Sequence, residues 1–159
     1  FKACFPGGSS CALLTAKDID VAMDFESLQL KHTALGTASL IVMDDTADMV
    51  KVANRLSHFY RNESCGKCTP CREGTYWVTE ILKRIERGEG TIFDLNKIEK
   101  VCQQMEENAF CPLAPSAAYP IMSCIHEFKN EFIAYIQKNP NANKKPEMKI
   151  AYPYLTVIK

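Results

Sequence analysis

Apolar residues recur at intervals of three and four over most of the chain after residue 45, a pattern that predicts amphipathic helices. We expect four of them, at about 46–62, 70–87, 94–106 and 117–137. Asp45 or Thr46 can cap the first helix, and Pro112 and Pro115 are expected to block helix formation between the last two. Four helices with short connections favour a small bundle.

The first 45 residues lack this helical period and instead mix turn signals with short apolar runs. Residues 7–10, Gly-Gly-Ser-Ser, predict a tight turn, and residues 38–43 predict a buried strand. The fold class is therefore α+β. We expect a strand-rich unit at 1–45, the helical bundle at 46–138, and a polar linker with an extended tail at 139–159, which is typical either of a strap on a partner or of a frayed end.

Composition narrows the possible partners. Lys plus Arg and Asp plus Glu are equal at 19 each, so no net field would draw the chain to nucleic acid or to an acidic membrane. No apolar run approaches the roughly 20 residues that a membrane span needs. The chain opens with Phe1 and shows no secretory signal, and its first residues resemble the end of a strand. We therefore expect it to be the C-terminal part of a longer protein.

Three of the eight cysteines, Cys65, Cys68 and Cys71, lie within seven residues, with two residues between neighbours. Iron–sulfur sites with four thiolates are built on such loops. A ferredoxin-type loop would carry its next cysteine where Thr75 stands, so the fourth sulfur must come from elsewhere. Zinc and disulfides are the alternatives, but zinc sites usually pair two C-x-x-C segments, and the crowding of three thiols disfavours disulfides.

The remaining cysteines differ in their surroundings. Cys102 and Cys124 fall on the apolar stripes of the third and fourth helices, so we interpret both as small buried hydrophobes. Cys111 lies in the turn between these helices, free of any stripe, and is the candidate fourth ligand. Nothing distinguishes Cys4 or Cys11 from ordinary thiols.

Other residues near the motif have weaker claims. Lys67 and Arg72 are the nearest cations and could moderate the negative charge of a cluster. Tyr76 and Trp77, one turn past Cys71, are expected in the core. The histidines share no ligand spacing, so none is assigned a metal or catalytic role; they are His32, His58 and His126.

Residues 63–74 read Glu-Ser-Cys-Gly-Lys-Cys-Thr-Pro-Cys-Arg-Glu-Gly, and Cys111 follows forty residues after Cys71, with Tyr119-Pro120 beyond it. This arrangement resembles the flavoprotein subunit of respiratory complex I. Segments 6–10 and 35–44 resemble the end of the β-grasp domain of that family. The resemblance implies one [4Fe–4S] cluster, and its ligands would be Cys65, Cys68, Cys71 and Cys111.

The resemblance also implies a place in an electron relay. NADH and FMN would bind in a part of the protein upstream of this chain, and the cluster would pass electrons to iron–sulfur subunits beside it. The implied location is the peripheral arm of the complex, on the cytoplasmic side of a bacterial inner membrane or in the mitochondrial matrix, without direct insertion into the bilayer. The fragment alone is not expected to be catalytic or to bind FMN or NADH.

Alternatives remain at this point. The same module occurs in soluble NAD-linked hydrogenases, formate dehydrogenases and electron-bifurcating enzymes, which would be cytoplasmic. The second alternative is a bundle held together by zinc or a cluster, which docks subunits and transfers no electrons. The sequence also departs from the family after Cys111, because Pro115 stands where an Asp could cap the last helix, leaving Ser116 as a weaker candidate.

Overall fold

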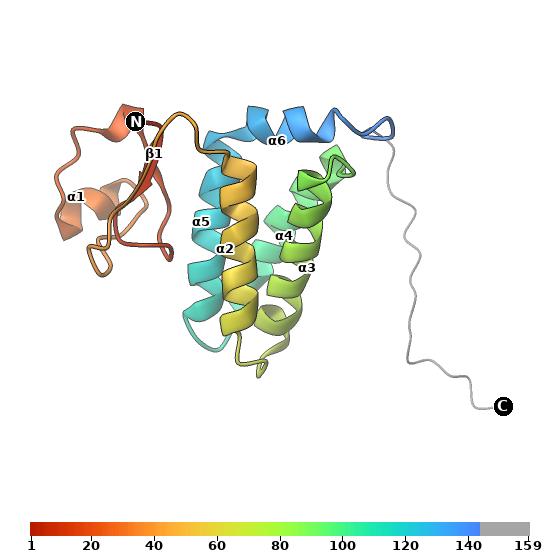
Figure 1. The fold of residues 1–159 in the computed structure, drawn as a ribbon. Helices are drawn as coiled ribbons and strands as arrows, with labels where there is room; N and C mark the ends of the chain where they lie inside the picture. The colour runs from red at the N-terminus through yellow and green to blue at the C-terminus, as the bar shows by residue number, and fades with distance from the viewer. Residues whose placement is uncertain (144–159) are drawn as a thin grey trace.

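The computed structural model describes residues 1–143 and shows an α+β fold, in which a small sheet lies beside a helical bundle (Figure 1). The sheet has the strand order β2-β1-β3, and both pairings are antiparallel. In the register, Cys4 lies opposite Leu14 on one side and Val42 on the other. The strands are β1 (Ala3–Phe5), β2 (Leu14–Thr15) and β3 (Ile41–Met43).

The strand-rich unit differs from expectation in two places. The segment predicted as a buried strand pairs only over β3, an edge strand of the sheet, where Ile41 and Val42 are exposed and Met43 alone is buried. A short 3-10 helix, η1 (Ala16–Asp18), and a short α-helix, α1 (Phe25–Leu30), also occur here. Asp24 caps α1 by accepting a hydrogen bond from the Ser27 N–H at 2.7 Å. Such a short helix is too brief to show a period in the sequence.

Four helices form the bundle, as predicted, and a fifth crosses one end of it (Figure 1). In the bundle α2 packs against α3 and α5, and α4 packs against the same two helices, so the four occupy the corners of a square. The helices are α2 (Met49–Glu63), α3 (Thr69–Glu86), α4 (Ile92–Asn108), α5 (Leu113–Glu127) and the crossing helix α6 (Lys129–Ile136).

Side-chain caps decide where two of these helices begin. Asp48 caps α2, not Asp45 or Thr46, by accepting hydrogen bonds from the Val50 and Lys51 N–H groups. Thr91 and Asp94 form a capping box at the start of α4. Both helices consequently begin within three residues of the predicted positions.

The expectation for the α4–α5 connection was wrong about the prolines. Helix α5 begins at Leu113, and Pro115 is its third residue. Proline is tolerated there because N–H groups of the first turn have no partner inside the helix. The Ser116 N–H then donates to the Pro112 carbonyl at 2.9 Å, closing the first turn without a side-chain cap.

The predicted last helix is divided in two. Phe128, with φ −118° and ψ 31°, leaves the helical conformation between α5 and α6. The change of direction turns α6 across the end of the bundle, where Phe132 and Ile136 become buried. Burial of these two side chains is a tertiary effect that a helical period cannot reveal.

One continuous apolar core joins the sheet to the bundle. Phe5 and Met43 from the sheet belong to the same buried cluster as Met49, Leu82 and Phe132 from the helices. The sheet is therefore held against the bundle by shared packing. Within residues 1–143, no helix combines the length and apolar character needed to cross a bilayer. The predicted tail lies largely outside the described residues.

Candidate metal centre

The predicted thiols lie on two connections at the same end of the bundle, opposite α6 (Figure 1). Cys65 and Cys68 occupy the α2–α3 connection, and Cys71 lies in the first turn of α3. Gly66 reverses the chain with φ 74°, a left-handed conformation that glycine adopts without steric cost. Cys111 lies on the α4–α5 connection.

The four thiols divide evenly between the interior and the surface. Cys68 and Cys71 are 8% and 4% exposed, whereas Cys65 and Cys111 are exposed, and none of the four takes part in a disulfide. A group held by all four would therefore lie at the rim of the bundle. One side of it would rest on the core and the other would face the surroundings.

The pKa shifts of Cys71 and Cys68 have causes on both connections. Burial raises the pKa of the Cys71 thiol, and the charges of Cys68, Cys111 and Cys65 shift it in the same direction. The backbone N–H of Phe110, next to Cys111, lowers the pKa of Cys68. Thiolates gathered in this way repel one another unless a cation compensates their charge, which is the situation that metal binding resolves.

Hydrogen bonds hold the α2–α3 connection in shape. The Ser64 hydroxyl lies 3.3 Å from the Cys71 Sγ and accepts a hydrogen bond from the Gly66 N–H, also at 3.3 Å. Arg72 donates from Nη1 to the Gly66 carbonyl at 2.8 Å and pairs through Nε with Glu73 at 2.9 Å. Arg72 is thus engaged with the loop itself, whereas Lys67 is exposed.

Sequence reasoning missed Ser64 and the Phe110 N–H. The signal for Ser64 was available, since it is a hydroxyl residue directly before the first cysteine of the motif. The Phe110 contact had no such signal, because every residue except proline has a backbone N–H. Which atom this N–H contacts depends on how the two connections pack.

The donor set fits a four-iron cluster. Such a cluster takes one thiolate at each of four irons, and four free thiols meet that need. The N-terminus of α3, with Pro70 in its first turn, adds the positive end of a helix dipole beside an anionic group. Within residues 1–143, no three Cys, His, Asp or Glu side chains are set closely enough to hold one metal ion. A cluster makes a different demand, because its ligands stand at separate corners of a cube.

The other cysteines are packed in the interior. Cys102 and Cys124 are 1% and 0% exposed, which confirms their interpretation as small hydrophobes. Burial raises the pKa of Cys102 to about 12 and that of Cys124 further, so both remain protonated at neutral pH. Cys4 and Cys11 are buried in the strand-rich unit, where the Cys11 thiol donates to the Gly8 carbonyl at 3.1 Å.

The expectation of a buried aromatic pair beside the motif was wrong. Tyr76 and Trp77 are 42% and 51% exposed. The core-facing positions of this part of α3 are taken by Gly74, Thr75 and Val78, which are buried. The Arg61 guanidinium instead lies over the Tyr76 ring at 4.4 Å, on the outer face of the bundle.

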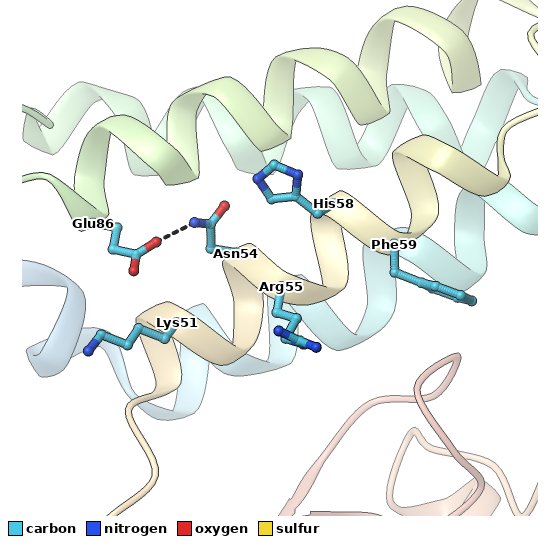
Figure 2. A pocket seen from close by; sticks show the side chains of 6 residues that line it. All are labelled: Lys51, Asn54, Arg55, His58, Phe59 and Glu86. Atoms are coloured by element: carbon cyan, nitrogen blue, oxygen red, sulfur yellow. Dashed lines mark hydrogen bonds between the residues drawn. The ribbon is translucent and has the colours of Figure 1, made fainter.

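A hollow of about 530 Å³ lies on α2 and α3, away from the thiols, and Figure 2 shows its lining. Asn54 donates a hydrogen bond across it to Glu86. Burial lowers the pKa of His58, and the nearby Lys83 and Arg61 charges add to this effect. The lining contains no thiol. Its residues are Lys51, Asn54, Arg55, His58, Phe59 and Glu86.

Four free thiols at one end of a helical bundle are the arrangement expected of a class of protein module that holds an inorganic centre through cysteine. The sequence pattern of one family, the NADH-ubiquinone oxidoreductase-F iron–sulfur binding region, matches residues 51–135. The chain belongs to this family.

Relatives of known name agree with this assignment. An F-type subunit of the NADH-quinone oxidoreductase of Rhizobium meliloti is 43% identical over 137 residues, which cover 86% of this chain and 32% of the relative. The mitochondrial NADH-ubiquinone oxidoreductase 51 kDa subunit of Neurospora crassa is 44% identical over 142 residues, covering 89% of this chain and 29% of the relative. The chain thus spans about a third of the length of these relatives.

Solved structures share the fold. An NAD+-reducing [NiFe]-hydrogenase, solved in the H2-reduced state, superposes with a TM-score of 0.76 and 28% sequence identity. The match covers 84% of this chain and 23% of that chain. The structure of the air-oxidized state gives the same values.

Proposed function

We propose that Cys65, Cys68, Cys71 and Cys111 hold one [4Fe–4S] cluster. The observation that carries this assignment is that Cys111 lies at the same end of the bundle as the other three thiols, where the backbone N–H of its neighbour Phe110 contacts Cys68. The description of the family as an iron–sulfur binding region supports it independently. Sequence position alone does not bring Cys111 to the loop, because it is the bundle that folds the α4–α5 connection against the α2–α3 connection.

The residues of the chain determine what such a centre can do. Four cysteine ligands leave no iron position open to a substrate, so when bound the cluster supplies transfer of single electrons. The buried Cys68 and Cys71 would anchor it to the core. The exposed Cys65 and Cys111 would form its outward side, toward which a redox partner can approach. The chain itself supplies no catalytic residue in this proposal.

We place this module in the flavoprotein subunit of an NADH:quinone oxidoreductase. The relatives that are 43% and 44% identical are named as subunits of NADH-quinone and NADH-ubiquinone oxidoreductases. In the proposed relay, NADH reduces FMN in a part of the protein outside this chain, the cluster takes electrons one at a time, and neighbouring iron–sulfur subunits receive them. The module then belongs to the peripheral arm of the complex, on the cytoplasmic or matrix side of the membrane, and reaches quinone only through the other subunits.

A second candidate function is supported by the structural comparison. The NAD+-reducing [NiFe]-hydrogenase shares the fold at 28% identity, so the same module can serve a hydrogenase of this kind. The higher identity to the quinone oxidoreductases favours the first assignment. The two proposals share the cluster and differ only in the partner that receives or donates electrons.

The proposal is tested by purifying the chain under anaerobic conditions and supplying iron and sulfide. We expect about four irons and four sulfides per chain, and an electron paramagnetic resonance signal that appears on reduction with dithionite. A chain that binds zinc and gives no resonance signal would instead support a role in docking subunits without electron transfer. A chain that takes up neither metal would refute the ligand assignment.

A further inference from the structure

Ser64 lies at the end of α2, directly before the first cysteine of the motif, and its backbone is fixed by the helix. Its N–H donates to the Tyr60 carbonyl at 3.1 Å, and its φ and ψ of −65° and 122° turn the chain out of the helix. The side chain is only partly exposed. A residue held in this way presents its hydroxyl in a defined direction.

The hydrogen bond between the Ser64 hydroxyl and the Cys71 sulfur can be assigned a donor. A serine hydroxyl has one donor and two acceptor positions. The Gly66 N–H occupies one acceptor position, and the Cys71 Sγ lies within hydrogen-bond distance at 3.3 Å. A cysteine that binds iron is a thiolate and has no proton to give. The Ser64 hydroxyl must therefore be the donor of this hydrogen bond when Cys71 is a ligand.

Other groups around Cys71 do not replace this donor. The Thr75 hydroxyl donates to the Cys71 carbonyl at 2.8 Å and not to its sulfur. The Phe110 N–H serves Cys68. Within residues 1–143, no second hydroxyl is within hydrogen-bond reach of any of the four sulfurs.

We propose that Ser64 is a positioning residue that raises the reduction potential of the cluster by donating a hydrogen bond to the Cys71 thiolate. Reduction adds one electron and hence one negative charge, which spreads onto the sulfurs. A donor to a ligand sulfur stabilises that more negative state and favours reduction. This inference rests on the proposed function, because it requires the cluster to be bound through Cys71.

The test compares four variants of the full chain, each loaded with its cluster, by redox titration followed with paramagnetic resonance. Ser64→Ala removes the donor. Ser64→Thr keeps it, and Ser64→Val has nearly the shape of Thr without the hydroxyl. Ser57→Ala is the matched control, because Ser57 is a buried serine of the same helix whose hydroxyl bonds the Asn54 carbonyl and no sulfur.

We expect Ser64→Ala and Ser64→Val to shift the midpoint potential to more negative values, with Ser64→Thr and Ser57→Ala close to the unsubstituted chain. Loss of iron in Ala and Val but retention in Thr would overturn the inference, because the hydroxyl would then be needed to hold the cluster rather than to set its potential. Equal potentials in all variants would overturn the inference, and so would loss of iron in all three Ser64 variants, which would indicate a purely steric role. Absence of a cluster from the unsubstituted chain would instead refute the proposed function.

Discussion

The Tyr135 hydroxyl on α6 donates a hydrogen bond of 2.5 Å to Asp48, the residue that caps α2. One carboxylate therefore caps the start of α2 and also anchors α6 through Tyr135, 87 positions later in the chain. Burial opposes the charge on Asp48, but the hydrogen bonds from Tyr135, Lys51 and Val50 outweigh it and lower the pKa of Asp48. The contact fixes α6 across the end of the bundle.

Tyr135→Phe should destabilise the fold by about 1 kcal/mol at pH 8 through loss of this hydrogen bond. The bond to Asp48 raises the pKa of Tyr135 to about 12, above its ordinary value of 10. Its stabilising effect is therefore complete below pH 10 and is lost as the pH rises toward 12. Urea denaturation of both proteins across this range should show the difference between them shrinking. A difference that stayed constant up to pH 12 would argue against the contact.

Asp94→Ala should cost about 2–3 kcal/mol in the free energy of unfolding. The Asp94 carboxylate is 0% exposed, accepts hydrogen bonds from the Thr91 N–H and hydroxyl at 2.7 and 2.9 Å, and forms an ion pair with Arg84. The substitution removes a cap and leaves the partly exposed Arg84 without its partner. Asp24→Ala, which removes an exposed cap of α1, should cost clearly less. Equal losses in urea denaturation would contradict the role of burial.

Cys111→Ala should abolish the cluster and much of the stability it lends to the bundle. Cys102→Ala should keep full iron content and lose about 1 kcal/mol to a packing defect, and Cys124→Ala should behave alike, because both thiols are buried in the core. Iron and sulfide analysis of the three purified variants checks this. The same iron content in all of them would remove Cys111 from the ligand set.

Gly74→Ala should destabilise the bundle by about 1–2 kcal/mol although alanine favours helices. A Cβ at this position would stand 2.6 Å from the Met105 Cγ and 2.7 Å from its Sδ, so α3 and α4 would have to separate or Met105 would have to move. The double variant Gly74→Ala/Met105→Ala should cost less than the sum of the single variants. Additive losses in thermal or urea unfolding would show that the two residues do not compete for space.

The apolar period of the sequence located the helices well, but it located their ends and changes of direction less well. The apolar period placed α2, α3 and α4 within three residues of their observed starts, because an amphipathic stripe reports the face that a helix buries. It failed at Phe128, where the stripe continues but the helix axis changes direction. It also overstated the burial of Trp77, because the apolar character of this side chain does not reveal that smaller residues of α3 are the ones that face the core.

The cysteine spacing by itself favoured an iron–sulfur centre over zinc or disulfides, since three thiols two residues apart can reach three corners of one cluster through local geometry alone. The apolar period separated Cys102 and Cys124 from Cys111, because two lie on helical stripes and one does not. Only the tertiary structure decided that the Phe110 N–H and the Ser64 hydroxyl meet these sulfurs. The aim of a hydrogen-bond donor depends on how two distant connections pack, and that is a property of the folded bundle rather than of any segment of its chain.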